Sequence, residues 1–158
     1  MDWILLSPGY FLETRETMKL VLNLLILPSL FLLVSCSDDD PTFSCDDQAI
    51  ISDSELATAS RDAVTIQSLE IDGNCLKIRI SASGCDGDSW QVRLLGSELV
   101  MESLPPQRGM LLSLDNQELC DAVITREMTF DITSTQVDGL SIWLNFIDTD
   151  QRILYEYE

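Results

Sequence analysis

The stretch LSIWLNFIDTDQRILYEY, residues 140–157, decides the fold class. Apolar residues recur at every second position on both sides of a polar break over residues 148–151. They are Leu140, Ile142, Leu144, Phe146, Ile153, Tyr155 and Tyr157. This pattern predicts two antiparallel strands that share one buried face. Trp143 and Ile147 fall on the opposite face of the first strand, so we expect that strand to be central in its sheet and covered on both sides.

The same period of two appears earlier in the chain. Residues 64–71 alternate with a bulge expected at Ser68, the sequence Asp72-Gly73-Asn74 supplies a turn, and residues 76–81 alternate again. This pattern predicts a second hairpin with one face in water. Shorter runs at residues 90–94, 110–114 and 123–132 bring the total to about seven strands separated by Gly, Pro and Asp turns. We therefore predict an all-β fold, an antiparallel β-sandwich over residues 63–158.

Four of the five cysteines fit a disulfide framework, namely Cys45, Cys75, Cys85 and Cys120. The chain has no CxxC pair, so a site with four thiolate ligands for zinc is disfavoured. If residues 75–83 form one strand, Cys75 and Cys85 lie roughly 30 Å apart, too far for a disulfide. Two pairings remain: Cys45 with Cys75 and Cys85 with Cys120, or the crossed alternative. We favour the first.

Composition excludes several functions. The chain has 158 residues, with 27 acidic and 9 basic side chains and no histidine. Nucleic-acid binding needs clustered cations, so we expect no nucleic-acid partner. The lack of histidine removes His-based catalytic triads and mixed Cys/His zinc sites, and no Gly-x-Ser-x-Gly motif is present. We predict that the protein is not an enzyme and needs no cofactor or metal ion.

The N-terminal part has the pattern of an export signal. Met18-Lys19 precedes an apolar run over residues 20–34, and an aspartate run begins at Asp38. This order predicts a signal peptide over residues 18–35 rather than a membrane-spanning helix. Residues 1–17 place Asp2, Glu13 and Glu16 ahead of the signal, where positive charge is expected. We interpret residues 1–17 as an upstream extension from a misassigned start, with translation beginning at Met18.

Leu33-Val34-Ser35-Cys36 resembles the lipobox of Gram-negative bacterial lipoproteins, in which signal peptidase II cuts before the cysteine. The resemblance implies that Cys36 becomes the first mature residue and carries acyl chains, palmitate among them, so that the membrane is a partner through this lipid anchor. Several acyl chains make such an anchor effectively permanent. Ser37, in place of a retaining aspartate, implies delivery to the outer membrane. The run Asp38-Asp39-Asp40 resembles signals for display on the cell surface, although a solvated tether explains it equally well.

Residues 36–62 are predicted to form a lipidated acidic tether ahead of the sandwich. Within it, Ser52-Asp53-Ser54-Glu55 has the spacing of a capping box and predicts a short helix through Ser60. From Cys36 onward the chain keeps 24 of its 27 acidic and 7 of its 9 basic residues, a net charge of −17. The acidity therefore belongs to the domain itself.

A second resemblance concerns the sandwich. Cys75-Leu76-Lys77-Ile78, Ser83-Gly84-Cys85, Pro105-Pro106 and Cys120-Asp121-Ala122 with Phe130-Asp131 are similar to a pattern in small uncharacterised lipoproteins with an immunoglobulin-like sandwich, such as the C-terminal domain of NigD-like proteins. The resemblance implies an immunoglobulin-like form of the fold. The chain lacks the histidine that follows the second cysteine in that pattern, so no function is carried over.

Four features are candidate sites. Asp86-Gly87-Asp88-Ser89 offers oxygen atoms for Ca²⁺ but lacks the spacing of an EF-hand, and a solvated loop is the preferred interpretation. Asp148 and Asp150 are best explained as turn residues. An aromatic sugar platform would consist of Trp90, Trp143, Tyr155 and Tyr157, although aromatic residues at strand period usually belong to the core. Residues 99–109 lack periodicity and are expected to form the longest loop, a first place to look for binding.

Three functions are compatible with these observations. The favoured one is a non-enzymatic binding or accessory module, displayed from the outer membrane and engaging a protein or a glycan. The alternative is a structural or envelope-assembly lipoprotein without a ligand of its own, on the periplasmic or the outer side. A hydrolase that uses carboxylates alone ranks last, because two carboxylates at glycosidase separation are uninformative without a cleft.

Overall fold

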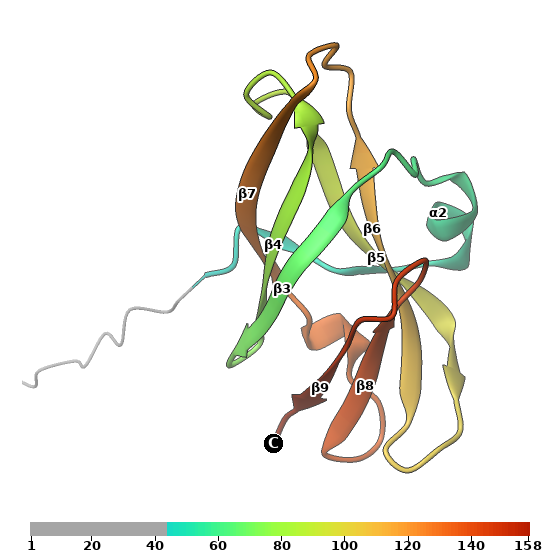
Figure 1. Ribbon diagram of the computed structural model, residues 1–158. Helices are drawn as coiled ribbons and strands as arrows, with labels where there is room; N and C mark the ends of the chain where they lie inside the picture. The colour runs from blue at the N-terminus through green and yellow to red at the C-terminus, as the bar shows by residue number, and fades with distance from the viewer. Residues whose placement is uncertain (1–43) are drawn as a thin grey trace, which may run out of the picture. The chain divides into compact units, whose positions relative to one another are not determined.

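The computed structural model describes residues 44–158, so Cys36, the signal peptide and the first part of the tether lie outside it. Within residues 44–158 there are nine strands, one α-helix and one 3-10 turn (Figure 1). The strands are β1 (Asp47–Gln48), β2 (Ile50–Ile51), β3 (Thr65–Asp72), β4 (Cys75–Gly84), β5 (Gln91–Met101), β6 (Gln107–Asp115), β7 (Ala122–Asp131), β8 (Ser141–Phe146) and β9 (Arg152–Glu156). They form a four-stranded and a five-stranded sheet, which confirms the predicted all-β sandwich. No helix in this part of the chain is long and apolar enough to cross a membrane.

The strand orders are β1-β7-β4-β3 in the first sheet and β2-β5-β6-β8-β9 in the second. The three hairpins and the β4–β7 pair are antiparallel, but β1 with β7, β2 with β5, and β6 with β8 run parallel. The prediction of wholly antiparallel sheets is therefore wrong for these three pairs. The chain between β6 and β8 passes through β7 in the other sheet, and a long crossover of this kind permits parallel pairing. The strand order also differs from that of an immunoglobulin domain, in which the third and sixth strands are neighbours. Here the third and sixth long strands are β5 and β8, and β6 lies between them.

Both predicted hairpins are present. β3 and β4 pair from Asp72↔Cys75 onward, and Gly73 in their turn has a φ of 56°, a conformation that favours glycine. The register shifts between Ile66 and Ser68, where the bulge was expected. The β8–β9 turn contains Asp148 with a φ of 67°, which confirms its prediction as a turn residue, because aspartate tolerates this region better than most side chains do.

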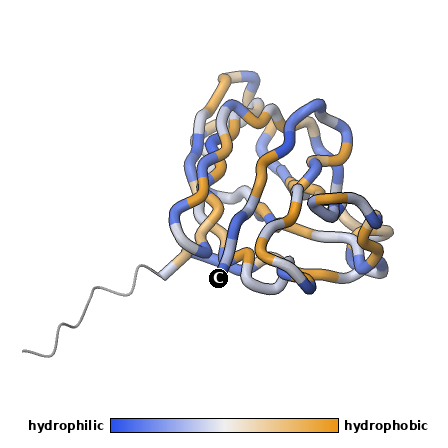
Figure 2. Tube along the Cα trace, turned by 90° about the horizontal axis from the view of Figure 1, so that it is seen from below, coloured by the Kyte–Doolittle hydropathy of each residue, from blue (hydrophilic) through white to orange (hydrophobic). Residues whose placement is uncertain are grey.

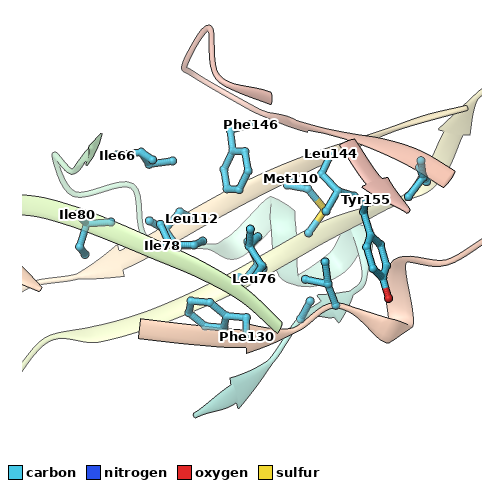
Figure 3. Packing of buried hydrophobic residues seen from close by; sticks show 14 residues of the cluster. Ile66, Leu76, Ile78, Ile80, Met110, Leu112, Phe130, Leu144, Phe146 and Tyr155 are labelled. Atoms are coloured by element: carbon cyan, nitrogen blue, oxygen red, sulfur yellow. The ribbon is translucent and has the colours of Figure 1, made fainter. Parts of the chain in front are cut away.

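The core lies between the two sheets (Figure 3). Figure 2 shows hydrophobic and hydrophilic residues alternating along the strands, as expected when only one face of each strand is buried. The fully buried core side chains include Leu76, Ile78, Ile80, Leu94, Met110, Leu114, Phe130, Ile132, Ile142, Leu144 and Tyr155. Burial of each aliphatic side chain contributes about 1.5–3 kcal/mol. Trp143, on the other face of β8, is only half-buried, so the predicted second cover of that strand is incomplete.

The polar side chains that reach into the buried region include those of Tyr155 and Arg108, beside the smaller Ser113 and Thr135. The Tyr155 hydroxyl donates to Asn74 Oδ1 (2.6 Å) and accepts from Gln136 Nε2 (2.7 Å), so it joins β9 to the turn between β3 and β4. Burial raises the pKa of Tyr155. Arg108 is 5% exposed; one of its guanidinium nitrogens donates to the Ser97 carbonyl while its Nε has no partner among the described residues. Burial lowers the pKa of Arg108.

The segment ahead of β3 belongs to the sandwich, contrary to the prediction of a tether up to residue 62. β1 adds to the first sheet beside Phe130, and β2 adds to the second beside Leu95, so one short segment crosses between the sheets. Helix α2 (Asp53–Thr58) follows, and the Ser52 hydroxyl accepts from the Glu55 N–H at its start (3.3 Å), the interaction that the capping box predicted. Composition suggested a tether because this segment is polar, but its backbone pairs with the sheets regardless of polarity.

The prediction of a long loop over residues 99–109 is also wrong. β5 continues to Met101 and β6 begins at Gln107, with Val100 opposite Arg108, so only residues 102–106 form the tip. A register shift between Gly96 and Val100 interrupts the alternation, which is why the sequence looked aperiodic there.

Candidate functional site

A groove opens along the side of the sandwich between β5 and β7. At this side of the sandwich, β7 is the outermost long strand of the first sheet and β5 is the outermost long strand of the second. The short strands β1 and β2 cover these edges only near Phe130 of β7 and Leu95 of β5. The groove holds a cavity of about 460 Å³, lined by Asp46, Asp47, Gly87, Asp88, Trp90, Val92, Arg126, Glu127, Met128, Thr129 and Phe130. It combines an apolar floor with a charged rim, which is the usual character of a binding site.

Strand alternation explains which side chains enter the groove. In the β4–β7 ladder Arg126 lies opposite Ile80 and Met128 lies opposite Ile78. Opposite residues share a face, and Ile78 and Ile80 are core residues, so Arg126 and Met128 point between the sheets. Trp90 and Val92, which pack against the same core, enter from the β5 side.

Arg126 holds the loop at one end of the groove. Its guanidinium donates to the Asp86 carbonyl (2.9 Å) and forms an ion pair with Asp88. Gly87, between them, has a φ of 75°, and a side-chain carbon there would lie 3.0 Å from the Arg126 Nε. Glycine is therefore needed at this position both for its backbone conformation and for its small size.

The loop Asp86–Ser89 binds an internal carboxylate rather than a cation. Glu118 accepts from the N–H groups of Cys85 (2.5 Å) and Gly87 (3.1 Å) and from the Ser89 hydroxyl (2.9 Å). Desolvation raises the pKa of Glu118, but these hydrogen bonds outweigh it and lower the pKa to about 2. Converging N–H groups attract anions, so the loop does not fit the Ca²⁺ site considered from the sequence. No group of three metal-ligating side chains occurs among residues 44–158.

The aromatic platform considered from the sequence is not assembled. Trp90 lines the groove, whereas Tyr155 is fully buried in the core. The Tyr157 ring lies 4.9 Å from that of Tyr155, between ring centroids. Trp143 lies on the outer face of the second sheet, where the Arg152 guanidinium stacks 4.5 Å from its ring centroid. The four rings therefore offer no common surface.

The cysteines form the pairing that we favoured. Cys45 bonds to Cys75 with a Cα separation of 5.7 Å, and Cys85 bonds to Cys120 with a Cα separation of 4.9 Å. The first disulfide fixes the N-terminal segment to the start of β4. The second holds the Asp86–Ser89 loop against the segment that carries Glu118. Cys36 lies outside the described residues.

A second, wider cavity of about 620 Å³ lies at the Cys45–Cys75 disulfide. It is lined by Ser44, Cys45, Asp47, Gln48, Asp72, Gly73, Asn74, Cys75 and Asp131. The Thr133 hydroxyl and N–H bind the Asp131 carboxylate (2.6 and 2.8 Å) and lower its pKa. Its lining lacks large apolar side chains such as the Trp90, Val92, Met128 and Phe130 of the groove, so it is a weaker candidate than the groove. Asp148 forms an ion pair with Arg61 (2.6 Å) in a separate region.

Sequence reasoning missed the groove with its Arg126, and it missed Glu118, which binds the Asp86–Ser89 loop. Glu118 lies 33 positions from Cys85, and only the Cys85–Cys120 disulfide hinted that the two segments meet.

Comparison with known proteins identifies no family. No family model matches the chain, and no curated protein is significantly similar to it. One solved structure is similar, that of a protein of unknown function, DUF1344, from Bacteroides vulgatus ATCC 8482. The identity is 12% and the TM-score 0.48, over 71% of this chain and 57% of that one. This chain thus spans little more than half of the length of that structure.

Proposed function

We propose that the protein is a lipoprotein of the cell envelope, anchored to the outer membrane through Cys36, whose sandwich is a non-enzymatic binding module for a protein or a glycan. The groove between β5 and β7 is the observation that carries the binding role. It is open and partly apolar, and it lies on a scaffold held by two disulfides. Disulfides suit an oxidising compartment such as the envelope.

Electrostatics favours binding over carboxylate-only hydrolysis. A general acid among carboxyl groups needs a raised pKa. In the described part of the chain the two carboxyl groups with a shifted pKa, Glu118 and Asp131, are both lowered. Both are held ionised by hydrogen bonds, and neither suits proton donation.

The anchor is tested with Cys36→Ala and, as a matched control, Ser37→Ala, both in the full chain. We expect Cys36→Ala to abolish labelling with radioactive palmitate and to leave an uncleaved precursor or a protein released from the membrane. Ser37→Ala should still be labelled. Normal cleavage and unchanged membrane partition of Cys36→Ala would refute the lipid anchor.

The binding role is tested by chemical crosslinking and purification of the intact lipoprotein from cells. A binding module should crosslink to a specific protein or glycan, and it should no longer do so when its disulfides are reduced and the sandwich is unfolded before the crosslinker is added. Recovery of envelope-assembly components alone would favour the structural alternative.

A further inference from the structure

The edge of β7 that faces away from β4 has a defined hydrogen-bonding pattern. The Thr129 N–H donates to the Asp46 carboxylate (2.9 Å), and the Asp131 carbonyl accepts from the Ala49 N–H (2.8 Å). Both groups therefore face the side on which β1 lies. The N–H and C=O groups of a strand alternate in direction, so those of Glu127, Thr125 and Val123 face the same side. β1 begins at Asp47, opposite Phe130, and does not pair with them.

A segment of the chain itself pairs with one part of this edge. β1 pairs in parallel with Phe130 and Asp131, and the Asp46 side chain then takes the N–H of Thr129 in place of a further backbone group. Residues 122–128 of β7 pair with β4 on one side and have no partner strand among the described residues on the other. Within residues 44–158 the edge is therefore paired along part of its length only.

The groove beside this edge suits alternating side chains. A strand added to β7 would direct every second side chain between the sheets, toward Trp90, Val92 and Met128, and the others toward solvent. The other edge of the first sheet is less suitable, because β3 has a bulge and carries Glu70 and Asp72. Bulges and charges are devices that protect an edge from pairing.

Charge indicates the chemistry of the added strand. Four carboxylates line the groove (Asp46, Asp47, Asp88 and Glu127), against one guanidinium, that of Arg126. Arg126 is already paired with Asp88, and Lys77 reaches Glu127 only at 3.9 Å in an exposed pair of little strength. A second copy of this chain would bring two domains of charge −17 together and is disfavoured.

We propose that the edge of β7 from Val123 to Glu127 binds an extended peptide segment of a protein partner, with apolar side chains alternating with lysine or arginine. The proposal rests on the binding role proposed above and names its class of partner. Backbone pairing supplies affinity, the apolar floor selects alternate side chains, and the carboxylates select positive charge.

The test uses the purified full-length protein and a synthetic peptide of about eight residues in which valine and lysine alternate. Amide hydrogen exchange is followed by NMR. We expect the peptide to slow exchange at Thr125 and Glu127 and to bind more weakly as salt is added. A peptide with glutamate in place of lysine should not bind, and neither should one whose backbone nitrogens are all methylated, because methylation removes the donors for either strand direction without altering the protein.

Two variants at position 125 separate the contribution of the backbone N–H from that of the side chain. Thr125→Pro removes an N–H that makes no bond to β4 and should weaken peptide binding by about tenfold. Thr125→Val keeps the N–H and should bind like the wild type. If Thr125→Pro fails to fold, the methylated peptide decides alone.

Several results would overturn the proposal: no peptide binding at about 1 mM, equal binding of the glutamate peptide, or protection at the β5–β6 tip around Leu104 instead of at Thr125. Binding of a neutral glycan such as maltoheptaose without a change at Thr125 and Glu127 would also overturn it, while leaving the general binding role in place. Absence of any partner in the crosslinking experiment on cells would instead remove the binding role itself.

Discussion

Asp46 and Thr129 bind each other through three hydrogen bonds. The Asp46 N–H donates to Thr129 Oγ1 (2.9 Å), and the Asp46 carboxylate accepts from the Thr129 N–H (2.9 Å) and hydroxyl (2.8 Å). This contact lies directly before β1, the first strand of the described residues. It therefore sets the boundary between the paired and the open part of the β7 edge.

Replacement of Asp46 should loosen this boundary. Asp46→Ala removes two acceptor contacts at an exposed site, and we expect it to lower the free energy of unfolding by about 1 kcal/mol. Asp46→Asn keeps one acceptor oxygen and should lose less. Urea denaturation measures both, and Asp46→Ala should also speed hydrogen exchange at Thr129. An unchanged exchange rate there would show that the contact does not hold the segment.

Glu118 should make stability depend on pH in an acidic window. Its folded-state pKa, about 2, lies below its ordinary value of 4.5. The stabilisation is therefore fully present above pH 4.5 and is lost as the pH falls toward 2. Glu118→Gln should be less stable than the wild type at neutral pH, and the difference should shrink across this window. Ser89→Ala, which removes one donor, should show a smaller effect. A difference that stays constant across the window would contradict the role of Glu118.

The buried hydroxyl of Tyr155 should stabilise the fold through its two hydrogen bonds. Tyr155→Phe leaves Asn74 Oδ1 and Gln136 Nε2 without their partner, and the expected loss is about 1–3 kcal/mol of unfolding free energy. Tyr157→Phe is the matched control, since its hydroxyl makes longer contacts of 3.2 Å to Val137. Equal losses for the two variants would mean that the hydrogen bonds of Tyr155 add nothing.

Arg108 should be replaceable by an apolar residue. Its charge is buried, and its Nε has no partner within residues 44–158. Arg108→Met keeps most of the volume and removes the cost of burying the charge, so thermal unfolding should occur at the same or a higher temperature. Arg108→Ala should be destabilised through the cavity it leaves. Strong destabilisation by Arg108→Met would show that its hydrogen bond to Ser97 outweighs that cost.

Each disulfide should stabilise the sandwich. The pairs Cys45–Cys75 and Cys85–Cys120 close loops of 30 and 35 residues, and removal of either with alanine should cost about 2–4 kcal/mol. Loss of Cys85–Cys120 should also reduce the acid-sensitive contribution of Glu118, because it frees the segment that carries this residue. Loss of Cys45–Cys75 serves as the control for that second effect.

Local pattern allowed prediction of the hairpins, the cap at Ser52 and the core positions, because alternation and capping depend on neighbouring residues. The length of one strand excluded a Cys75–Cys85 disulfide but left two pairings open. Parallel pairing of β6 with β8, and of the segment 47–51 with both sheets, depends on backbone contacts between distant segments, and polar residues such as Asp47 and Gln48 gave no sign of it. The groove was missed for the same reason: Trp90 and Arg126 belong to different sheets and meet only through the fold.

Hydrogen exchange of the protein without a partner tests the open β7 edge most directly. Arg126 and Met128 should be protected, because their N–H groups face β4, whereas Thr125 and Glu127 should exchange nearly as fast as solvent-exposed amides. Addition of the alternating valine–lysine peptide should then slow the exchange of Thr125 and Glu127 and leave that of Arg126 and Met128 unchanged. Equal protection at all four positions in the unbound protein would contradict the account, because it would show that the edge is already paired.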